Sequence, residues 1–415
     1  MTEKKKTYRR QIIRELYFAR ILSCAELSLR INKSLPLTTK MLNELIREGS
    51  VDEIGYAAST GGRRPAMYSL KKNNFYIVSV AMDQFVTRIA IMDLENNPVT
   101  KIEKIELPLT KDPQSLGLLA ERINDVIKQS GVPKSKIAGI GMGMPGFVDV
   151  RKGVNYSFLE VSNGSISEYL AERIQLPVFI DNDSSLIALA ELRFGAARGS
   201  QNAMIVNIGW GIGLGMVLNG ELFRGHNGFA SEFSHIPLFS NGKLCSCGKR
   251  GCLETESSLL VVIEKARKGL IQGKVTVATN LPEDHVEQSL GSIVKAALNG
   301  DQYAIELISE AGYNIGRGVA ILIHILNPKE IILSGRGSAV GKILHAPIQQ
   351  AINEHCIPKL SAHTVIQISE LGYDAELIGA AALVMENYEK EVEVKARPSK
   401  LPPKNGREKL ISVKS

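Results

Sequence analysis

Residues 231–256, SEFSHIPLFSNGKLCSCGKRGCLETE, contain three of the five cysteines of the chain. Cys245, Cys247 and Cys252 follow the pattern C-x-C-x4-C, and His235 lies ten residues before the first of them. Three thiolates and one imidazole provide a complete tetrahedral shell for Zn²⁺. The spacing therefore predicts a structural zinc site built from these four residues, with one metal ion per chain.

Two glycines between the cysteines support this prediction. Gly248 and Gly251 allow the sharp chain reversals that turn three sulfur atoms toward one point. The alternative is a loop with incidental free thiols. A disulfide is less expected, because no secretory signal is recognisable and cytosolic thiols stay reduced.

The composition is that of an ordinary globular protein, but its charge is uneven. Of 415 residues, 44% are hydrophobic and 22% are charged, which predicts two or three domains with substantial cores. Residues 1–72, the head, have a net charge of +8; residues 73–387, the body, have −5; residues 388–415, the tail, have +4. A basic head indicates binding to a polyanion, and a solvated basic face without a partner is the alternative.

Neither a targeting segment nor an apolar run of about 18 residues is present. We therefore expect a cytoplasmic protein without a membrane partner. The tail is rich in Lys, Glu and Pro and has no apolar periodicity, so it is expected to be disordered or loosely attached.

The head shows the pattern of three short helices followed by a hairpin. The first helix is predicted over 8–19, and a capping box at Ser23 and Glu26 begins the second. Pro36 suits the first turn of the third helix, which is expected to end at Gly49.

The third helix and the hairpin loop are the predicted DNA-contacting parts. The polar face of the helix offers Thr38, Thr39, Lys40, Asn43 and Arg47. Such side chains hydrogen-bond base edges and phosphates in the major groove. Strands at 51–54 and 67–70 enclose a loop in which Arg63 and Arg64 follow two glycines, which suits a wing on phosphates or in the minor groove. The head is therefore predicted to be a winged helix-turn-helix, with a small protein-interaction module as the alternative.

Strands and helices alternate in the body, which predicts an α/β fold. The first half shows strands at 75–82, 86–94 and 99–107, a helix at 113–129 and a strand at 137–143. A similar opening recurs at 203–208 and 213–218, where Asn219-Gly220 forms a hairpin turn. Two comparable halves predict two lobes, at about 73–200 and 201–387, with a cleft between them.

The residues around the cysteines resemble the signature of the ROK family (repressors, open reading frames and sugar kinases). The matching run is Glu232-x-x-His235 followed by Cys245-x-Cys247-Gly248-x-x-Gly251-Cys252-x-Glu254. Three further motifs lie upstream in that family's order: Gly143-Met144-Pro145-Gly146, Asn182-Asp183 and the glycine-rich segment 207–215. The resemblance spans roughly 75–386 and implies the duplicated, actin-like fold of sugar kinases and heat-shock ATPases. The head is similar to the winged helix-turn-helix of ROK repressors, whose wing has a similar Gly-Arg-Arg-Pro run.

Asn182 and Asp183 are the central candidates for sugar binding. They follow a short predicted strand at 178–180, and an amide and a carboxylate can bind vicinal sugar hydroxyls. Asp183 could instead serve only as the N-cap of the helix predicted over 184–194. The resemblance implies that Asp183 occupies the position of the catalytic base of ROK sugar kinases.

The resemblance also implies further sugar contacts at Glu232, His235 and Glu254. His235 would bind Zn²⁺ through one ring nitrogen and offer the other to a sugar hydroxyl. Gly146 follows a strand, where a small residue lets a ligand approach the backbone. ROK proteins usually have Pro-Asn-Leu near the position of Ser157-Phe158-Leu159, and the missing asparagine leaves the identity of the sugar open.

The phosphate-binding elements of a kinase are altered. Phosphoryl transfer needs glycine-exposed backbone amides and Mg²⁺ to hold ATP. ROK kinases have Asp-x-Gly-Gly-Thr in their first hairpin, where this chain has Asp83-Gln84-Phe85-Val86-Thr87. Phe85 and Val86 would obstruct such a turn.

The second and third nucleotide elements depart as well. Trp210 stands where the kinases have threonine, and Ser334 and Arg336 interrupt the glycine turn at 333–337. We therefore expect no catalytic residue and no ATP or Mg²⁺ cofactor, although Asp183 remains.

The sequence thus predicts a transcriptional repressor of carbohydrate-utilisation genes, regulated by a sugar or sugar phosphate. A homodimer or homotetramer would place its heads on a double-stranded DNA operator. One alternative is an ATP-dependent sugar kinase with an accessory DNA-binding head. Another is a DNA-binding scaffold that no longer senses a sugar.

Overall fold

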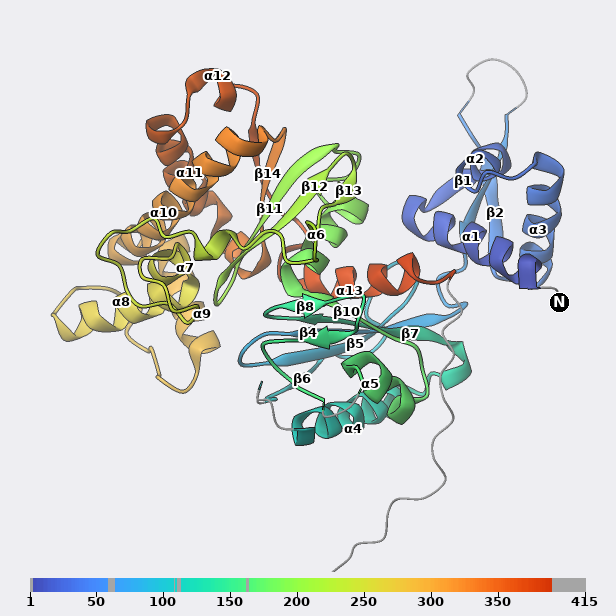
Figure 1. The fold of residues 1–415 in the computed structure, drawn as a ribbon, viewed down its shortest axis with the longest axis horizontal. Helices are drawn as coiled ribbons and strands as arrows, with labels where there is room; N and C mark the ends of the chain where they lie inside the picture. The colour runs from blue at the N-terminus through green and yellow to red at the C-terminus, as the bar shows by residue number, and fades with distance from the viewer. Residues whose placement is uncertain (1–2, 59–63, 108, 110–112, 162–163, 390–415) are drawn as a thin grey trace, which may run out of the picture.

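The computed structural model describes residues 3–58, 64–107, 109, 113–161 and 164–389 (Figure 1). Its elements form a small N-terminal unit and two five-stranded sheets with their helices. No helix of these residues is long and apolar enough to cross a membrane.

The N-terminal unit contains three helices and a three-stranded antiparallel sheet. Its elements are α1 (Glu3–Ala19), β1 (Ile21–Ser23), α2 (Cys24–Arg30), α3 (Leu35–Arg47), β2 (Val51–Tyr56) and β3 (Ala66–Leu70). Ser23 and Glu26 form the predicted capping box, each side chain bonding the other's backbone N–H. The strand β1 was not predicted, because three residues are too short for a periodic pattern and β1 is defined by its pairing with β3.

The first five-stranded sheet and its helices follow in the chain. They comprise β4 (Tyr76–Met82), β5 (Thr87–Met92), β6 (Glu103–Ile105), α4 (Pro113–Ser130), β7 (Ile137–Met144), the small hairpin β8 (Val148–Asp149) and β9 (Val154–Asn155), α5 (Ile166–Ile174), β10 (Val178–Asn182) and α6 (Asp183–Phe194). The helices α4 and α5 bury an apolar face against this sheet.

The second sheet is surrounded by more helices. Its part of the chain comprises β11 (Asn202–Ile208), β12 (Ile212–Leu218), β13 (Glu221–Leu222), α7 (Glu254–Ser257), α8 (Leu259–Ile271), α9 (Val286–Leu298), α10 (Gln302–Leu326), β14 (Glu330–Ser334), α11 (Gly341–His355), α12 (Pro358–Ser361), β15 (Val365–Ile368) and α13 (Ala375–Glu386). Three short 3₁₀ turns, η2 (Phe233–His235), η3 (Gly335–Val340) and η4 (Gly372–Asp374), hold residues of the candidate site.

The two sheets have the same topology. Their orders are β6-β5-β4-β7-β10 and β13-β12-β11-β14-β15, so corresponding strands occupy corresponding places. In each sheet the first three strands pair antiparallel and the last three pair parallel. The predicted duplication is therefore confirmed.

Two helices cross between the halves. Helix α6 follows the first sheet but packs on β11 and β12, whereas α13 follows the second sheet but packs on β4 and β7 (Figure 1). Glycines permit the close approach: a Cβ on Gly215 would lie 2.2 Å from the Cβ of Ala188, and a Cβ on Gly141 would lie 1.9 Å from the carbonyl oxygen of Ala380. The predicted lobes are thus interlocked through their helices.

The N-terminal unit shares a hydrophobic core with the first sheet and α13. Buried Ile12 and Leu16 of α1 belong to the same cluster as Phe75, Ile77 and Leu377. This contact explains how the small unit is fixed to the body.

Aromatic side chains extend the contact to α6. The ring of Phe194 lies 5.5 Å from that of Tyr17, edge to face, and 6.0 Å from that of Phe18. The Tyr17 hydroxyl is hydrogen-bonded to the side chain of Asn96.

The first residues of the predicted disordered tail are ordered against this unit. The ring of Tyr388 stacks on Phe75 at 5.4 Å, and Glu389 forms a 2.5 Å ion pair with Arg14. Apolar stacking and charge pairing hold both residues, so the expected disorder is wrong for them. Residues 390–415 lie outside the described residues.

Candidate functional site

The predicted metal ligands come together. The ligand atoms of His235, Cys245, Cys247 and Cys252 all lie within 4.8 Å of one another. The Nδ1 atom of His235 lies 3.5 Å from the sulfur of Cys245, and the sulfurs of Cys247 and Cys252 are 3.6 Å apart. A tetrahedral ion with bonds of about 2.3 Å to sulfur separates its sulfur ligands by about 3.8 Å. The cluster could therefore hold a metal ion.

Glycines shape the cluster as expected. Gly248 and Gly251 have φ angles of +83° and +72°. A Cβ on Gly251 would lie 1.8 Å from the carbonyl oxygen of Phe239, so this position accepts glycine alone. The loop is fixed to α10, because Phe233 and Leu253 pack where a Cβ on Gly318 would otherwise stand.

Two carboxylates next to the cluster have distinct surroundings. The Nε2 atom of His235 faces Glu232 at 3.8 Å, on the side of the ring away from the thiols. Partial burial raises the pKa of Glu232, the charge of His235 opposes this rise, and the charge of Glu254 adds to it. Glu254 accepts a hydrogen bond of 3.2 Å from the N–H of Ile212 and fills the space that a side chain on Gly211 would need. Glu254 therefore also supports the glycine-rich segment, a role that the sequence did not reveal.

Asn182, not Asp183, caps helix α6. Its Oδ1 accepts hydrogen bonds from the N–H groups of Ser184 and Ser185 at 3.0 and 3.2 Å, and its Nδ2 donates to the carbonyl oxygen of Gly146 at 3.2 Å. Gly146 has a φ of +87°. The predicted sugar residues Gly146, Asn182 and Asp183 are thus neighbours. Asp183 is the first residue of α6 and does not serve as its N-cap.

Asp183 is held in an unusual electrostatic environment. Burial raises its pKa to about 6, and the nearby charges of Asp83 and Glu232 act in the same direction. The Ser184 N–H donates to its Oδ1 at 2.8 Å, which partly offsets this rise. A carboxylate with such a pKa accepts a proton readily near neutral pH.

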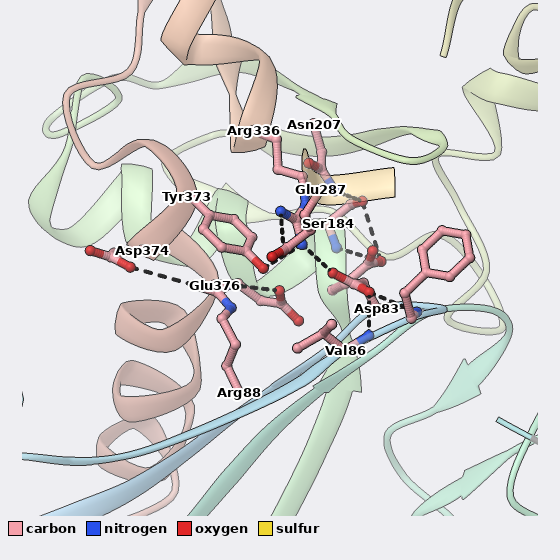
Figure 2. Close-up of polar contacts among 12 residues, drawn as sticks. Asp83, Val86, Arg88, Ser184, Asn207, Glu287, Arg336, Tyr373, Asp374 and Glu376 are labelled. Atoms are coloured by element: carbon pink, nitrogen blue, oxygen red, sulfur yellow. Dashed lines mark hydrogen bonds and ion pairs between the residues drawn. The ribbon is translucent and has the colours of Figure 1, made fainter. Parts of the chain in front are cut away.

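Arg336 links the two halves (Figure 2). Its guanidinium donates to Asp83, which follows β4, at 2.5 Å and to Glu287 of α9 at 2.8 Å. Glu287 also pairs with Lys104 of β6 at 3.4 Å. We call Asp83, Arg336, Glu287 and Lys104 the interlobe clasp, because its charges alternate in sign and belong to both sheets and their helices.

Aromatic rings enclose the guanidinium of Arg336. Its central carbon lies 4.5 Å from the ring centre of Trp210 and 3.9 Å from that of Tyr373, and Phe85 contacts Trp210 edge to face at 5.7 Å. Phe85, Trp210 and Arg336 are three of the residues that depart from the kinase pattern. They lie in separate parts of the sequence, and the structure brings them into contact.

A buried arginine, Arg88, also packs against the ring of Tyr373 (Figure 2). The guanidinium carbon of Arg88 is 3.4 Å from the ring centre, and its nitrogens lie 3.4 and 3.5 Å from Asp374 and Glu376. Burial, with Asp183 and Asp83 nearby, raises the pKa of Glu376 to about 8 despite Arg88. None of these residues was predicted, because no short motif marks them.

The prediction that Thr38 contacts DNA is wrong. Thr38 is fully buried, and its hydroxyl donates to the carbonyl oxygen of Ser34 at 3.1 Å. It lies on the apolar stripe of α3 with Met41, Leu42 and Leu45, all buried. A buried side chain cannot contact a base.

The other candidates of α3 are exposed. These residues are Thr39, Lys40, Asn43 and Arg47. The hydroxyl of Thr39 donates to the carbonyl oxygen of Leu35 at 2.8 Å. In the hairpin loop Arg64 is exposed, and Arg63 lies outside the described residues.

Comparisons with known proteins agree with this architecture. The ROK family pattern matches residues 79–387. The chain is 30% identical to the DNA-binding transcriptional dual regulator NagC of Escherichia coli K12 over 348 residues, 83% of this chain and 84% of that protein. It is also 32% identical to a glucokinase of Halalkalibacterium halodurans over 292 residues, 69% of this chain and 88% of the glucokinase.

A solved structure extends the similarity over nearly the whole molecule. The crystal structure of a ROK family transcriptional regulator, a homologue of the E. coli MLC protein, superposes with a TM-score of 0.74 and 25% sequence identity. The match covers 94% of this chain and 97% of that one. The common fold, the clustered cysteines and the extent of these matches lead to one conclusion: the chain belongs to the ROK family.

Proposed function

We propose that this protein is a transcriptional repressor of carbohydrate-utilisation genes whose DNA binding is regulated by a sugar or sugar phosphate. The observation that supports this most is the position of Arg336. Its guanidinium lies between Asp83 and Glu287 and against Trp210, among the residues that depart from the kinase pattern. A kinase needs open backbone amides and Mg²⁺ there to hold ATP phosphates.

Residues 1–72 would be the DNA-binding domain, a winged helix-turn-helix, and residues 73–387 the sugar-binding domain. Lys40, Asn43 and Arg47 are spaced by three and four residues, which places them on one face of α3. With Thr39 they would enter the major groove, and Arg63 and Arg64 would contact phosphates or the minor groove. The match with the MLC homologue, which covers 94% of the chain, supports the inclusion of the head.

The sugar would bind at Gly146, Asn182 and Asp183 on one side and at Glu232, His235 and Glu254 on the other. Zn²⁺ would be held by His235 and the three cysteines and would have a structural role. Because Nδ1 of His235 faces Cys245 and Nε2 faces Glu232, metal binding would orient the imidazole toward the sugar residues.

Helix α6 provides a route from the sugar to DNA. It begins at Asp183 and ends at Phe194, which packs on Tyr17 of α1. A sugar that binds one arrangement of the lobes more tightly would shift the population toward it, and α6 would displace the head. In a dimer this displacement would change the spacing of two recognition helices on a near-palindromic operator.

The test begins with operator selection. Full-length protein is incubated with genomic fragments of its host, and the bound fragments are sequenced and used in fluorescence anisotropy. We expect specific binding that weakens with salt, and a smaller salt slope in the Lys40→Ala, Arg47→Ala and Arg64→Ala variants. The sugar response is then measured with a panel of hexoses, pentoses, amino sugars and their phosphates. Absence of any specific fragment would refute the DNA-binding role.

A sugar kinase is the second candidate, and two observations favour it. Asp183 retains a carboxylate with a pKa of about 6, and the glucokinase of H. halodurans is 32% identical. A coupled assay for ADP release with ATP, Mg²⁺ and the same sugars separates the candidates. Brisk turnover of ATP with any sugar would replace the repressor proposal.

A further inference from the structure

Three aromatic side chains border the candidate sugar residues. Phe147 and Tyr156 adjoin Gly146 and Ser157 in the chain, at the two ends of the β8–β9 hairpin, and Phe229 precedes Glu232 by three residues. The ring of Phe229 lies 5.7 Å from that of Phe147 and 5.9 Å from that of Tyr156, with interplanar angles of 87° and 76°. We call these three residues the aromatic rim.

Backbone hydrogen bonds tie the rim to the candidate site. The N–H of Phe147 donates to the hydroxyl of Ser157 at 3.1 Å, and the N–H of Tyr156 donates to the carbonyl oxygen of Phe147 at 2.9 Å. The side-chain amide of Asn182 in turn donates a hydrogen bond of 3.2 Å to the carbonyl oxygen of Gly146. The backbone at Phe147 and Tyr156 is therefore fixed relative to Asn182.

Two of the three rim residues are exposed, and Phe229 is partly buried. The exposed fraction is 42% for Phe147 and 50% for Tyr156. The Tyr156 hydroxyl interacts with Asp149 at 3.4 Å and with Lys152 at 3.2 Å, which orients the ring while its body stays accessible. Grouped, oriented aromatic surface beside polar ligand groups is typical of a binding site.

We propose that the aromatic rim is a subsite for a second sugar ring, so that the effector is a disaccharide or another glycoside. This inference rests on the proposed function, in which the polar residues bind one sugar. The C–H groups on the flat side of a pyranose are weakly positive, and the face of an aromatic ring is negative, so the two surfaces attract. One sugar ring at Asn182 and Asp183 would leave the exposed rim uncovered, and a linked second ring would cover it.

The departure from the ROK sugar-contact pattern falls at the same place. The family resemblance implies a Pro-Asn-Leu run near Ser157, and the Ser157 hydroxyl accepts a hydrogen bond from the N–H of Phe147. This side chain thus supports the rim. The altered position is explained if the ligand extends toward the aromatic residues.

The test compares matched sugars by isothermal titration calorimetry on the full-length, zinc-loaded protein. The pairs are D-glucose with cellobiose, N-acetyl-D-glucosamine with N,N′-diacetylchitobiose, and D-xylose with xylobiose. We expect at least one disaccharide to bind about tenfold more tightly than its monosaccharide, equivalent to about 1.4 kcal/mol.

Substitutions in the aromatic rim test whether these side chains cause the preference for a disaccharide over its monosaccharide. Phe229→Ala and Tyr156→Ala are expected to reduce the ratio of the two Kd values to near one while the Kd of the monosaccharide stays within about twofold. Tyr156→Phe keeps the ring and is expected to keep most of the preference. Phe223→Ala is the matched control, because Phe223 is 45% exposed and lies outside the rim.

The outcomes distinguish this inference from the function on which it rests. If the wild type binds none of the six sugars, the sugar site itself is refuted. If it binds monosaccharides without preferring their disaccharides, the subsite is refuted and the sugar site stands. Equal weakening of both sugars in Phe229→Ala would assign the rim a structural role and also overturn the proposal.

Discussion

Asp183 and Phe194 are the first and last residues of helix α6, so a single element joins the candidate sugar site to the N-terminal unit. A helix of 12 residues is about 18 Å long. Phe194 contacts Tyr17 and Phe18 of α1, and Arg193 anchors the same end to Glu386 of α13 at 2.7 Å. Helix α6 thus connects the candidate sugar site directly with the surface on which α1 rests.

Replacing Phe194 tests this connection. We expect Phe194→Ala to bind the effector sugar as the wild type does but to lose the sugar-dependent change in operator affinity. The free energy of unfolding should fall by about 2 kcal/mol, because a partly buried aromatic ring is removed. Calorimetry with sugar and anisotropy with operator DNA measure the two properties. Ile271→Ala, at an 87% exposed residue at the end of α8, is the control; an unchanged response in Phe194→Ala would exclude α6 as the route.

The raised pKa of Asp183 predicts a stabilising substitution. An ordinary aspartate has a pKa of 3.8, whereas this one titrates at about 6 when folded. Between these values the folded protein binds more protons than the unfolded chain, so the stability associated with this group is present below about pH 4 and lost as pH rises through about 6.

Asp183→Asn does not titrate and should therefore be more stable than the wild type above about pH 6, by on the order of 2 kcal/mol. The difference should shrink toward zero near pH 4. Chemical unfolding at a series of pH values measures it, with Asp125→Asn, an exposed residue of α4, as the control. A difference that does not vary with pH would contradict the burial of this charge. Sugar binding should be lost in the same variant.

Removing one thiol tests the metal cluster. We expect Cys247→Ala to purify without zinc and to lose the sugar response, because in the proposed function the ion holds the loop that presents Glu232, His235 and Glu254. Metal content is measured by mass spectrometry and the response by anisotropy. Cys356→Ala removes a buried thiol outside the cluster and should retain both. A variant that responds to sugar normally without zinc would disprove the coupling.

The residues of the interlobe clasp should contribute unequally to the free energy of unfolding. Arg336 is 12% exposed, and its removal leaves Asp83 without its counter-charge and Glu287 with only the exposed Lys104. We expect Arg336→Ala to lower the free energy of unfolding by about 3 kcal/mol. Lys104 is 53% exposed, so Lys104→Ala should cost less than about 1 kcal/mol. Urea denaturation of both variants provides the comparison, and equal effects would refute the buried character of the clasp.

Local patterns in the sequence predicted local structure well. The apolar periods, the capping box at Ser23 and the cysteine spacing each depend on neighbouring residues, and the structure contains the corresponding helices and the clustered ligands. The error at Thr38 was avoidable, since this residue precedes Met41, Leu42 and Leu45 by three, four and seven positions, the spacing of one helix face.

Contacts between distant segments could not be predicted in this way. Arg336 meets Asp83 across 253 positions of the chain, and Glu287 resembles any polar residue at the start of a helix. Helices α6 and α13 each pack on the sheet of the other half. In the sequence this packing is marked only by scattered glycines. Such features depend on the assembled fold.

The core that α1 shares with Phe75 and Leu377 has a practical and an evolutionary consequence. Deleting residues 1–72 would expose these apolar residues of the body to solvent. A body expressed without the head should therefore aggregate. By the same reasoning, a lineage could not lose the N-terminal unit in one deletion without first replacing these apolar residues. The N-terminal unit and the body should therefore be retained or lost together.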